Sequence, residues 1–269
     1  AASGAAEEKA EEKEEAPVID IEPKAEIEYD DFSKLQFQVG EIISCDSMQV
    51  YKHMDIGSAK IMPQEMDGVR HYLVDELEPF EEFHVVRFQE MARAAMKEIR
   101  SRGHIPILVG GTGFYIQAVV RDIDFTENED HSGIREELEQ LAAERGEEHL
   151  HQMLAQIDPE SARAIHANNV KRVIRAIEYY RLTGEKISEH NKREREKNSP
   201  YDLYYYVLTR DRAALYERID RRVDIMMEQG LVDEVKRLKE MGCTRDMVAM
   251  QGLGYKEILD YLDGTISLG

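Results

Sequence analysis

The sequence predicts an α/β protein with a parallel sheet. Two runs, "LQFQVGEIIS" (residues 35–44) and "IPILVGGTG" (residues 105–113), are short, apolar and of strand type. The second is rich enough in Val, Ile and Leu to be buried on both faces, as parallel strands are. Residues 85–103 precede it with helical periodicity and end at a capping glycine, Gly103. The helix lies between a further short apolar run, "RHYLVDEL" (residues 70–77), and "IPILVGGTG". This order of strand, helix and strand, at this spacing, predicts a right-handed βαβ unit.

The remaining elements follow from the same patterns. Residues 201–209 return to a strand pattern. Residues 126–197 are helical throughout, which indicates a helical insertion. Residues 212–242 read as two helices with the break at Gly230. The fold class is therefore a parallel α/β core that carries an inserted helical domain.

Three regions are expected along the chain. Residues 1–31 hold twelve acidic and three basic side chains with few apolar anchors, which is typical of a disordered acidic linker. Residues 32–125 and 198–269 form the expected α/β core, and residues 126–197 the helical insertion.

Composition excludes several classes of protein. The 269 residues, 42% hydrophobic and 33% charged, fit a globular protein, and no apolar run approaches the ~20 residues of a membrane span. Two distant cysteines, Cys45 and Cys243, indicate a reducing cytoplasm and no disulfide framework. The nine histidines show no metal-ligand spacing. The net charge of −20 means that any nucleic acid must be bound by local basic clusters.

Two motifs lie where an α/β sheet places its ligands. "GGTG" (residues 110–113) follows a buried strand and precedes a helix, so its amides suit a phosphate or a flat ligand, or simply a tight turn. Asp46 and Ser47 end the first strand, at the ligand-binding edge of open α/β sheets. By position alone, an Asp-Ser pair is more often a cap for the next segment.

A basic helix is the third candidate feature. In "NNVKRVIRAIEYYRLTG" the apolar face is formed by Val170, Val173, Ile174 and Ile177. Lys171, Arg172 and Arg175 lie off that face within one turn, where they suit an RNA backbone. Arg218 and Arg222 form a similar i,i+4 pair. A solvated charged face is the commoner explanation of both groups.

Five segments together resemble one family, the bacterial tRNA dimethylallyltransferases, from about residue 40 to the end. They are "GEIISCDSMQVYKHMDIGSAK", "ILVGGTGFYIQA", "NNVKRVIRAIEYYRLTG", "RIDRRVDIMMEQGLVDEV" and "GLGYKEILDYLDG". The resemblance implies transfer of a dimethylallyl group from its diphosphate to N6 of adenosine 37, in tRNAs that read codons beginning with U. It implies a P-loop NTPase-like parallel sheet of nucleotide-binding type, and a helical insertion that grips the anticodon arm.

The resemblance also implies roles for single residues. Asp46 takes the catalytic role, as acceptor of the adenine amine proton. The implied tRNA contacts are Asp46, Ser47, Met48, Gln49, Thr112, Lys171, Arg172, Val173, Ile174 and Arg175. Candidates for binding the leaving diphosphate are Arg175, Arg218 and Arg222. The implied partners are tRNA and dimethylallyl diphosphate, with no membrane, for a cytoplasmic monomer.

The sequence departs from the family at both ends. The family's first β-loop-α unit, with its "GPTxxGKT" phosphate loop, does not precede "GEIIS", and the basic C-terminal segment does not follow Gly269. Mg²⁺ is the implied cofactor, although its usual P-loop Ser/Thr ligand is missing. We therefore expect reduced stability and reduced or no turnover. A catalytically inactive module that binds the anticodon arm is the alternative, and small-molecule phosphotransfer is disfavoured because it also needs the phosphate loop.

The N-terminal region has a likeness of its own. "IEYDDFSKLQFQVGEIIS" resembles the start of the C-terminal tRNA-binding module of methionyl-tRNA synthetase, and the acidic stretch before it resembles that protein's linker. Both families can contain "GEIIS", so a chimera joined at this pentapeptide is expected.

Overall fold

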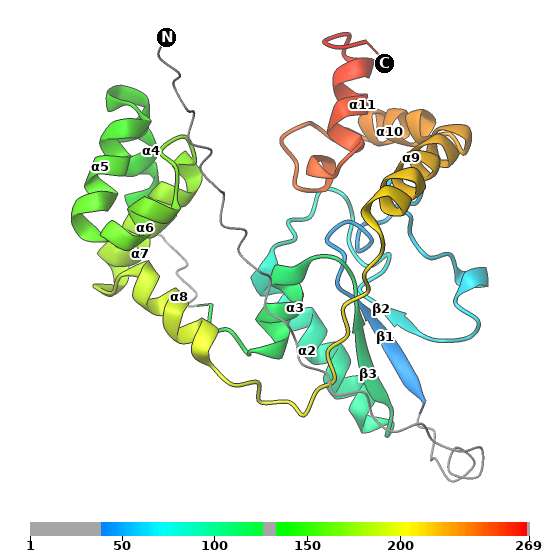
Figure 1. Ribbon diagram of the computed structural model, residues 1–269. Coiled ribbons are helices and arrows are strands. Elements are labelled where there is room, and N and C mark those ends of the chain that lie inside the picture. The colour runs from blue at the N-terminus through cyan, green and yellow to red at the C-terminus, as the bar shows by residue number, and fades with distance from the viewer. Residues whose placement is uncertain (1–38, 126–132, 268–269) are drawn as a thin grey trace, which may run out of the picture. The chain divides into compact units, whose positions relative to one another are not determined.

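The computed structural model describes residues 39–125 and 133–267 (Figure 1). The expected acidic linker, residues 1–31, and the start of the first predicted strand, residues 35–38, lie outside the described residues. So does most of the synthetase-like segment.

A parallel sheet forms the centre of the fold. It contains β1 (Gly40–Ser44), β2 (His71–Tyr72) and β3 (Ile105–Val109), in the order β2-β1-β3. Both pairings are parallel, and Ile43 of β1 lies opposite Leu108 of β3. The predicted α/β class with a parallel sheet is confirmed, although the run at residues 70–77 contributes a strand of only two residues.

Helix α2 (Val85–Ser101) connects β2 to β3, as its periodicity predicts. Its apolar face is buried in the main core with Ile43, and Phe88 stacks on Tyr115 with ring centroids 4.5 Å apart. Gly103 has φ of 74°, a backbone conformation that favours glycine and ends the helix. The core under the sheet therefore fixes the strand ends that carry the site.

Two expectations about strands are wrong. Ile105, Ile107 and Val109 of β3 are 46%, 45% and 50% exposed, so this strand is not buried on both faces. A parallel strand is buried twice only where elements cover both faces of the sheet, and these side chains lack such cover. Residues 201–209 form no strand, because none of the described strands supplies the backbone pairing that a strand needs.

The rest of the described chain is helical or irregular. The further elements are η1 (Pro63–Glu65), α3 (Gly113–Val120), α4 (Ile134–Arg145), α5 (Glu147–Ile157), α6 (Pro159–Ala164), α7 (Val170–Thr183), α8 (Ile187–Glu196), α9 (Arg212–Glu228), α10 (Leu231–Glu240), η2 (Ala249–Gln251) and α11 (Tyr255–Leu262). Gly230 precedes α10 as its N-cap with φ of 95°, so the predicted break between two helices is confirmed. Within the described ranges no helix is both long and apolar enough to cross a bilayer.

Helices α4 to α8 have a hydrophobic core of their own. Leu138, Leu150, Leu154, Val173 and Ile177 are fully buried in it. Apolar residues three or four positions apart supply these side chains, because that spacing places them on one face of each helix. We refer to α4–α8 as the helical unit.

The turn after β3 depends on a glycine. A Cβ atom on Gly110 would lie 2.5 Å from the backbone carbon of Cys45, whereas one on Gly111 would meet nothing within 4 Å. The missing side chain lets the turn approach β1, where Thr112 N–H donates to the Cys45 carbonyl over 3.2 Å. Gly110 therefore sets the distance between the GGTG turn and the residue before Asp46.

We expect Gly110→Ala to destabilise the fold by about 1–3 kcal/mol, because the added methyl group meets backbone that cannot rotate away. Gly111→Ala is the matched control and should change stability by less than about 0.5 kcal/mol. Urea unfolding of both variants measures the difference. Equal stabilities of the two variants would contradict the close approach.

A buried carboxylate ties the opposite end of β1 to the loop before β3. Glu41 accepts hydrogen bonds from Arg102 Nε over 3.1 Å and Nη2 over 2.7 Å, and His104 Nδ1 lies 2.5 Å from Oε1. The Arg102 hydrogen bonds lower the pKa of Glu41 from 4.5 to about 2, although burial acts in the opposite direction. Because the pKa is depressed in the folded state, this stabilisation is present above pH 4.5 and is lost toward pH 2.

Glu41→Gln should lower the unfolding temperature at neutral pH, since the amide cannot accept both guanidinium hydrogen bonds. The difference from the wild-type protein should shrink as the pH falls from 4.5 to about 2. Glu90→Gln, at an exposed position on α2, is the control. A difference that stays constant over this pH range would show that the Glu41 carboxylate does not titrate as described.

Candidate functional site

Asp46 lies just beyond the C-terminal end of β1. Its Oδ1 accepts the Met48 N–H over 2.8 Å, so the local cap favoured by position alone is present. Its Oδ2 receives no hydrogen bond from the described residues, and the side chain is half-buried. One oxygen therefore fixes the carboxylate and the other remains available to a donor on a ligand.

Ser44 links Asp46 to Gln49. The Ser44 hydroxyl accepts the Asp46 N–H over 3.4 Å and donates to Gln49 Oε1 over 3.2 Å. Gln49 Nε2 in turn donates to the Ala59 carbonyl over 3.3 Å. Sequence analysis missed Ser44 and Ala59. The only signal for Ser44 was its place as the last residue of the strand.

Met48 and Ser47 complete the turn after β1. A Cβ atom on Gly252 would lie 2.8 Å from Met48 Sδ, so the segment before α11 closely approaches this turn. Ser47 is half-buried between Asp46 and Met48. The backbone of this turn thus contacts the carboxylate through the Met48 N–H, and the roles of the Ser47 and Met48 side chains stay a prediction.

Thr112 is brought to the same edge of the sheet. It precedes α3, and its hydroxyl makes no cap hydrogen bond there. Its N–H donates to the carbonyl of Cys45, the residue before Asp46. Burial raises the pKa of the Cys45 thiol to about 12, which excludes this thiol as a nucleophile at neutral pH. Asp46, Gln49 and Thr112 are thus among the polar residues at this edge.

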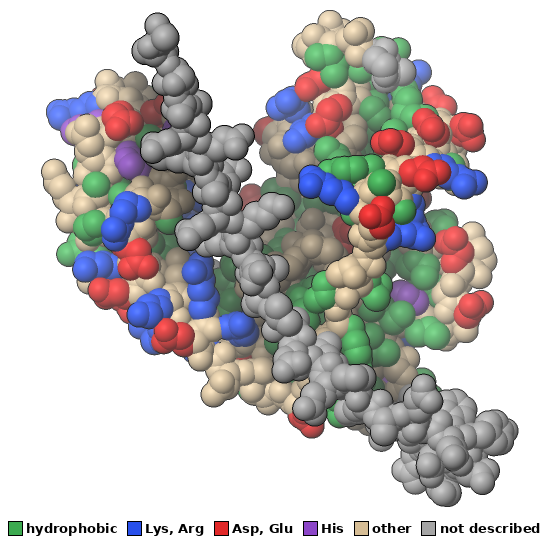
Figure 2. All heavy atoms as spheres, viewed as in Figure 1, with side chains coloured by type: hydrophobic (Ala, Val, Ile, Leu, Met, Phe, Trp, Pro, Cys, Tyr) green, Lys and Arg blue, Asp and Glu red, His purple; other side chains and the backbone are tan. Residues whose placement is uncertain are grey.

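The residues of α7 that were expected to contact tRNA lie on two different faces of the helix. Lys171, Arg172 and Arg175 are exposed, and none of their side chains makes a hydrogen bond or ion pair within the described ranges. Val173 and Ile174 are buried in the core of the helical unit, so the expectation of tRNA contact at these two residues does not hold for their side chains. Figure 2 shows Lys and Arg side chains over α7 and α8, interspersed with Asp and Glu.

The three arginines expected at the diphosphate are not joined by any observed contact. Arg218 and Arg222 are exposed on α9, and Arg175 is exposed on α7. No hydrogen bond or ion pair in the part of the chain described here connects them to Asp46. Their role stays a prediction.

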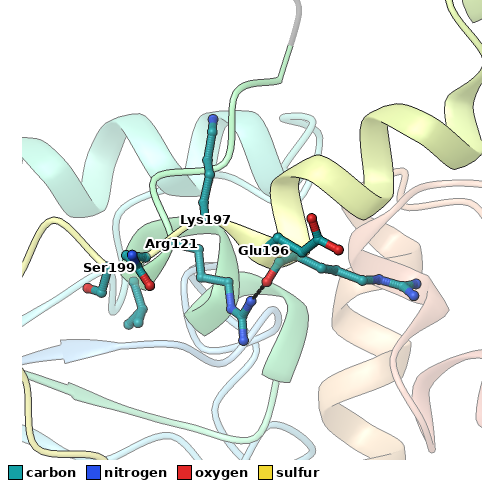
Figure 3. Close-up of a pocket in the computed structure, with 7 residues that line it drawn as sticks. Arg121, Glu196, Lys197 and Ser199 are labelled. Atoms are coloured by element: carbon teal, nitrogen blue, oxygen red, sulfur yellow. Dashed lines mark hydrogen bonds between the residues drawn. The ribbon is translucent and has the colours of Figure 1, made fainter.

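A pocket lies where the chain leaves α3 and where α8 ends (Figure 3). Arg121 donates there to the carbonyl of Arg195, which joins the two connecting segments. The side chains of Arg121 and Lys197 point in different directions in Figure 3, so their charges do not converge on one ligand. This pocket is a junction between segments and not the candidate site.

The described residues do not provide a ready-made metal site. Among them, no three His, Cys, Asp or Glu side chains gather around a point where an ion would be held. The donor set therefore does not fit Mg²⁺ by itself, and no chemical step is assigned to the ion below.

The comparisons with known proteins agree with one another. The family model described as "IPP transferase" matches residues 49–269. A "tRNA dimethylallyltransferase" of Lachnoclostridium phytofermentans is 62% identical over 229 residues, which cover 85% of this chain and 73% of that protein. One of Carboxydothermus hydrogenoformans with the same name is 54% identical over the same shares.

Solved structures show the same relationship. The tRNA isopentenylpyrophosphate transferase of Bacillus halodurans is 48% identical with a TM-score of 0.59, covering 85% of this chain and 71% of that one. A eukaryotic dimethylallyltransferase acting on tRNA is 30% identical with a TM-score of 0.68, covering 84% of this chain and 57% of that one. The chain therefore belongs to the IPP transferase family of prenyltransferases.

Proposed function

We propose that the chain transfers a dimethylallyl group from dimethylallyl diphosphate to N6 of adenosine 37, in tRNAs that read codons beginning with U. The observation that carries the proposal is the strand end at which Asp46 offers one oxygen beside Gln49 and Thr112. The names of the relatives support the same reaction. The basic side chains of α7 are the proposed contact with the anticodon arm.

The proposed chemistry assigns the proton to Asp46. The N6 amine is a poor nucleophile because its lone pair is conjugated with the purine ring, so it needs a proton acceptor as it reacts. A bond forms between N6 and the dimethylallyl carbon, and the bond from that carbon to the diphosphate oxygen breaks. The diphosphate leaves with the bonding electrons, and the N6 proton passes to the Oδ2 oxygen of Asp46. Taking the base out of its stack exposes N6 for this step.

Cationic side chains are proposed to neutralise the leaving diphosphate. The candidates are three exposed arginines, Arg175, Arg218 and Arg222. A guanidinium group suits a diphosphate because it can donate two parallel hydrogen bonds to phosphate oxygens. Mg²⁺ is proposed to arrive with the diphosphate, since this ion is commonly held by substrate phosphates rather than by a protein cage.

The proposal also covers the oligomeric state of the protein, its location and the origin of its N-terminal segment. We infer a monomer that acts in the cytoplasm. The likeness of residues 1–43 to a synthetase module supports a chimeric origin for that segment. Sequencing of source DNA across "GEIIS" tests this origin, and one uninterrupted native gene with the same junction would contradict an artificial joining of the two segments.

A binding module without turnover is the alternative function, which the names of the curated relatives do not favour. The described residues include no phosphate loop, and such a loop usually supplies much of the electrostatic stabilisation of a leaving phosphate. This candidate keeps the α7 contact with RNA but loses the transfer step. A transfer assay together with a binding assay separates the two candidates.

Asp46→Asn should lower the rate of dimethylallyl transfer by roughly 100-fold or more, because the amide cannot take the proton. The assay uses unmodified tRNA, dimethylallyl diphosphate and Mg²⁺, and tRNA affinity is measured in parallel. Transfer by the variant at the wild-type rate would exclude Asp46 as the base. Binding without transfer in both proteins would favour the alternative function.

Replacing Lys171, Arg172 and Arg175 one at a time with Gln should weaken tRNA binding and reduce the slope of log affinity against log salt by about 1 each. Each contact with a phosphate releases counterions, so its loss appears in the slope. Arg163→Gln, another exposed arginine of the helical unit, is the control. Unchanged slopes in all three variants would show that α7 faces solvent.

A further inference from the structure

Glu234 is a buried carboxylate that has no cationic partner among the residues that the structure describes. It lies on α10 and is 2% exposed. Its Oε2 accepts the N–H groups of Asp55 and Ile56 over 2.9 and 2.8 Å, and its Oε1 accepts the Gly57 N–H over 3.2 Å. Burying such a charge is costly unless hydrogen bonds replace its water. Three backbone amides from a loop about 180 positions away in the sequence therefore hold this carboxylate.

Tyr255 of α11 supplies the fourth hydrogen bond. Its hydroxyl donates to Glu234 Oε1 over 2.7 Å, and burial, together with the nearby carboxylate, raises the pKa of Tyr255. The hydroxyl therefore stays protonated and keeps donating. A Cβ atom on Gly57 would lie 2.6 Å from the Tyr255 ring, so the loop, the ring and the carboxylate are tightly fitted.

The loop held by Glu234 reaches Gln49 through two hydrogen bonds. Ile56, whose N–H binds Glu234, accepts the Ala59 N–H on its carbonyl over 2.9 Å. The Ala59 carbonyl accepts from Gln49 Nε2 over 3.3 Å. Ala59 has φ of 45°, a conformation uncommon for a residue with a side chain. Surrounding contacts are needed to keep it there.

Lys60 fixes the same loop from the other side. Its buried Nζ donates to the Tyr51 carbonyl over 2.6 Å and to Asp55 Oδ1 over 2.7 Å. It also binds Asp75 Oδ1 over 2.5 Å, and the Asp75 N–H donates to the Gln49 carbonyl over 3.1 Å. Lys60 therefore holds this loop by contacts independent of Glu234, and through Asp75 it also holds the backbone of Gln49.

The orientation of the Gln49 amide follows from these contacts. The Ala59 carbonyl requires a donor, so it selects Nε2, and Oε1 is left to accept from the Ser44 hydroxyl. The amide then has one N–H and one oxygen lone pair for a ligand. Adenine offers the matching pair, a donor at N6 and an acceptor at N7, whereas guanine offers two acceptors, O6 and N7.

We propose that Glu234 is a positioning residue that, through Ile56 and Ala59, fixes the amide of Gln49 in the orientation that selects adenine over guanine. The inference rests on the proposed function, because it takes the target base to be bound beside Asp46. Glu234 itself contacts no substrate. Its effect is on which base is accepted.

The test measures the affinity of the full chain for two anticodon stem-loop RNAs that differ only in adenosine or guanosine at position 37. The wild-type protein should prefer the adenosine RNA by roughly tenfold. Glu234→Gln should bring this preference close to one, because its NH₂ group would face backbone N–H donors. The salt dependence should not change, since the phosphate contacts are untouched.

Glu240→Gln is the matched control, an exposed glutamate on the same helix, and should keep the wild-type preference. Thermal unfolding shows whether each variant is folded. Should Glu234→Gln not fold, Ser44→Ala tests the opposite hydrogen bond of the Gln49 amide and should also reduce the preference. If Glu234 had a merely structural role, its replacement would lower the affinity for both RNAs equally and leave the ratio of the two affinities unchanged.

A folded Glu234→Gln protein that keeps the wild-type ratio of the two RNA affinities would overturn the inference. If Glu234→Gln does not fold, a Ser44→Ala protein that keeps this ratio would overturn it instead. A wild-type protein that binds both RNAs equally would overturn the inference while leaving the proposed function in place. A wild-type protein that binds neither RNA would overturn both.

Discussion

The site depends on the close parallel pairing of β1 with β3 and on the turn that follows β3. The Cys45 N–H donates to the Val109 carbonyl over 2.7 Å, and the Thr112 N–H returns to the Cys45 carbonyl. Because Gly110 has no side chain, these backbones approach closely enough to form both bonds. Asp46 and Thr112 therefore leave the sheet at the same edge, where open α/β sheets bind their ligands.

Around that edge, hydrogen bonds between distant segments orient each polar side chain. Ser44 holds both Asp46 and Gln49, and the loop held by Glu234 and Lys60 holds the glutamine from the other side. Most of these groups are buried or half-buried, where an unpaired donor or acceptor is costly. The amide of Gln49 and the carboxylate of Asp46 are consequently set before a ligand arrives, which is the condition for selective binding.

The net charge of the chain and the charge of α7 have opposite signs. The chain is strongly acidic overall, so long-range attraction of an RNA is not available to it. Exposed cations without ion-pair partners in the described ranges occur on α7, which belongs to the helical unit with its own hydrophobic core. In the function proposed above, phosphate contacts and base contacts would come from different elements, the first for affinity and the second for selection.

The sequence by itself determined the features that depend on local periodicity: the βαβ unit around α2, the helices of residues 134–196, and the place of Asp46 at a strand end. Only the tertiary structure decided the exposure of β3, the lack of a strand at residues 201–209, and the burial of Glu234 against the loop that holds Gln49. The physical reason is the separation along the chain of the residues that interact. Helix and strand patterns repeat over a few residues, whereas these contacts join segments far apart in the chain and leave no local pattern.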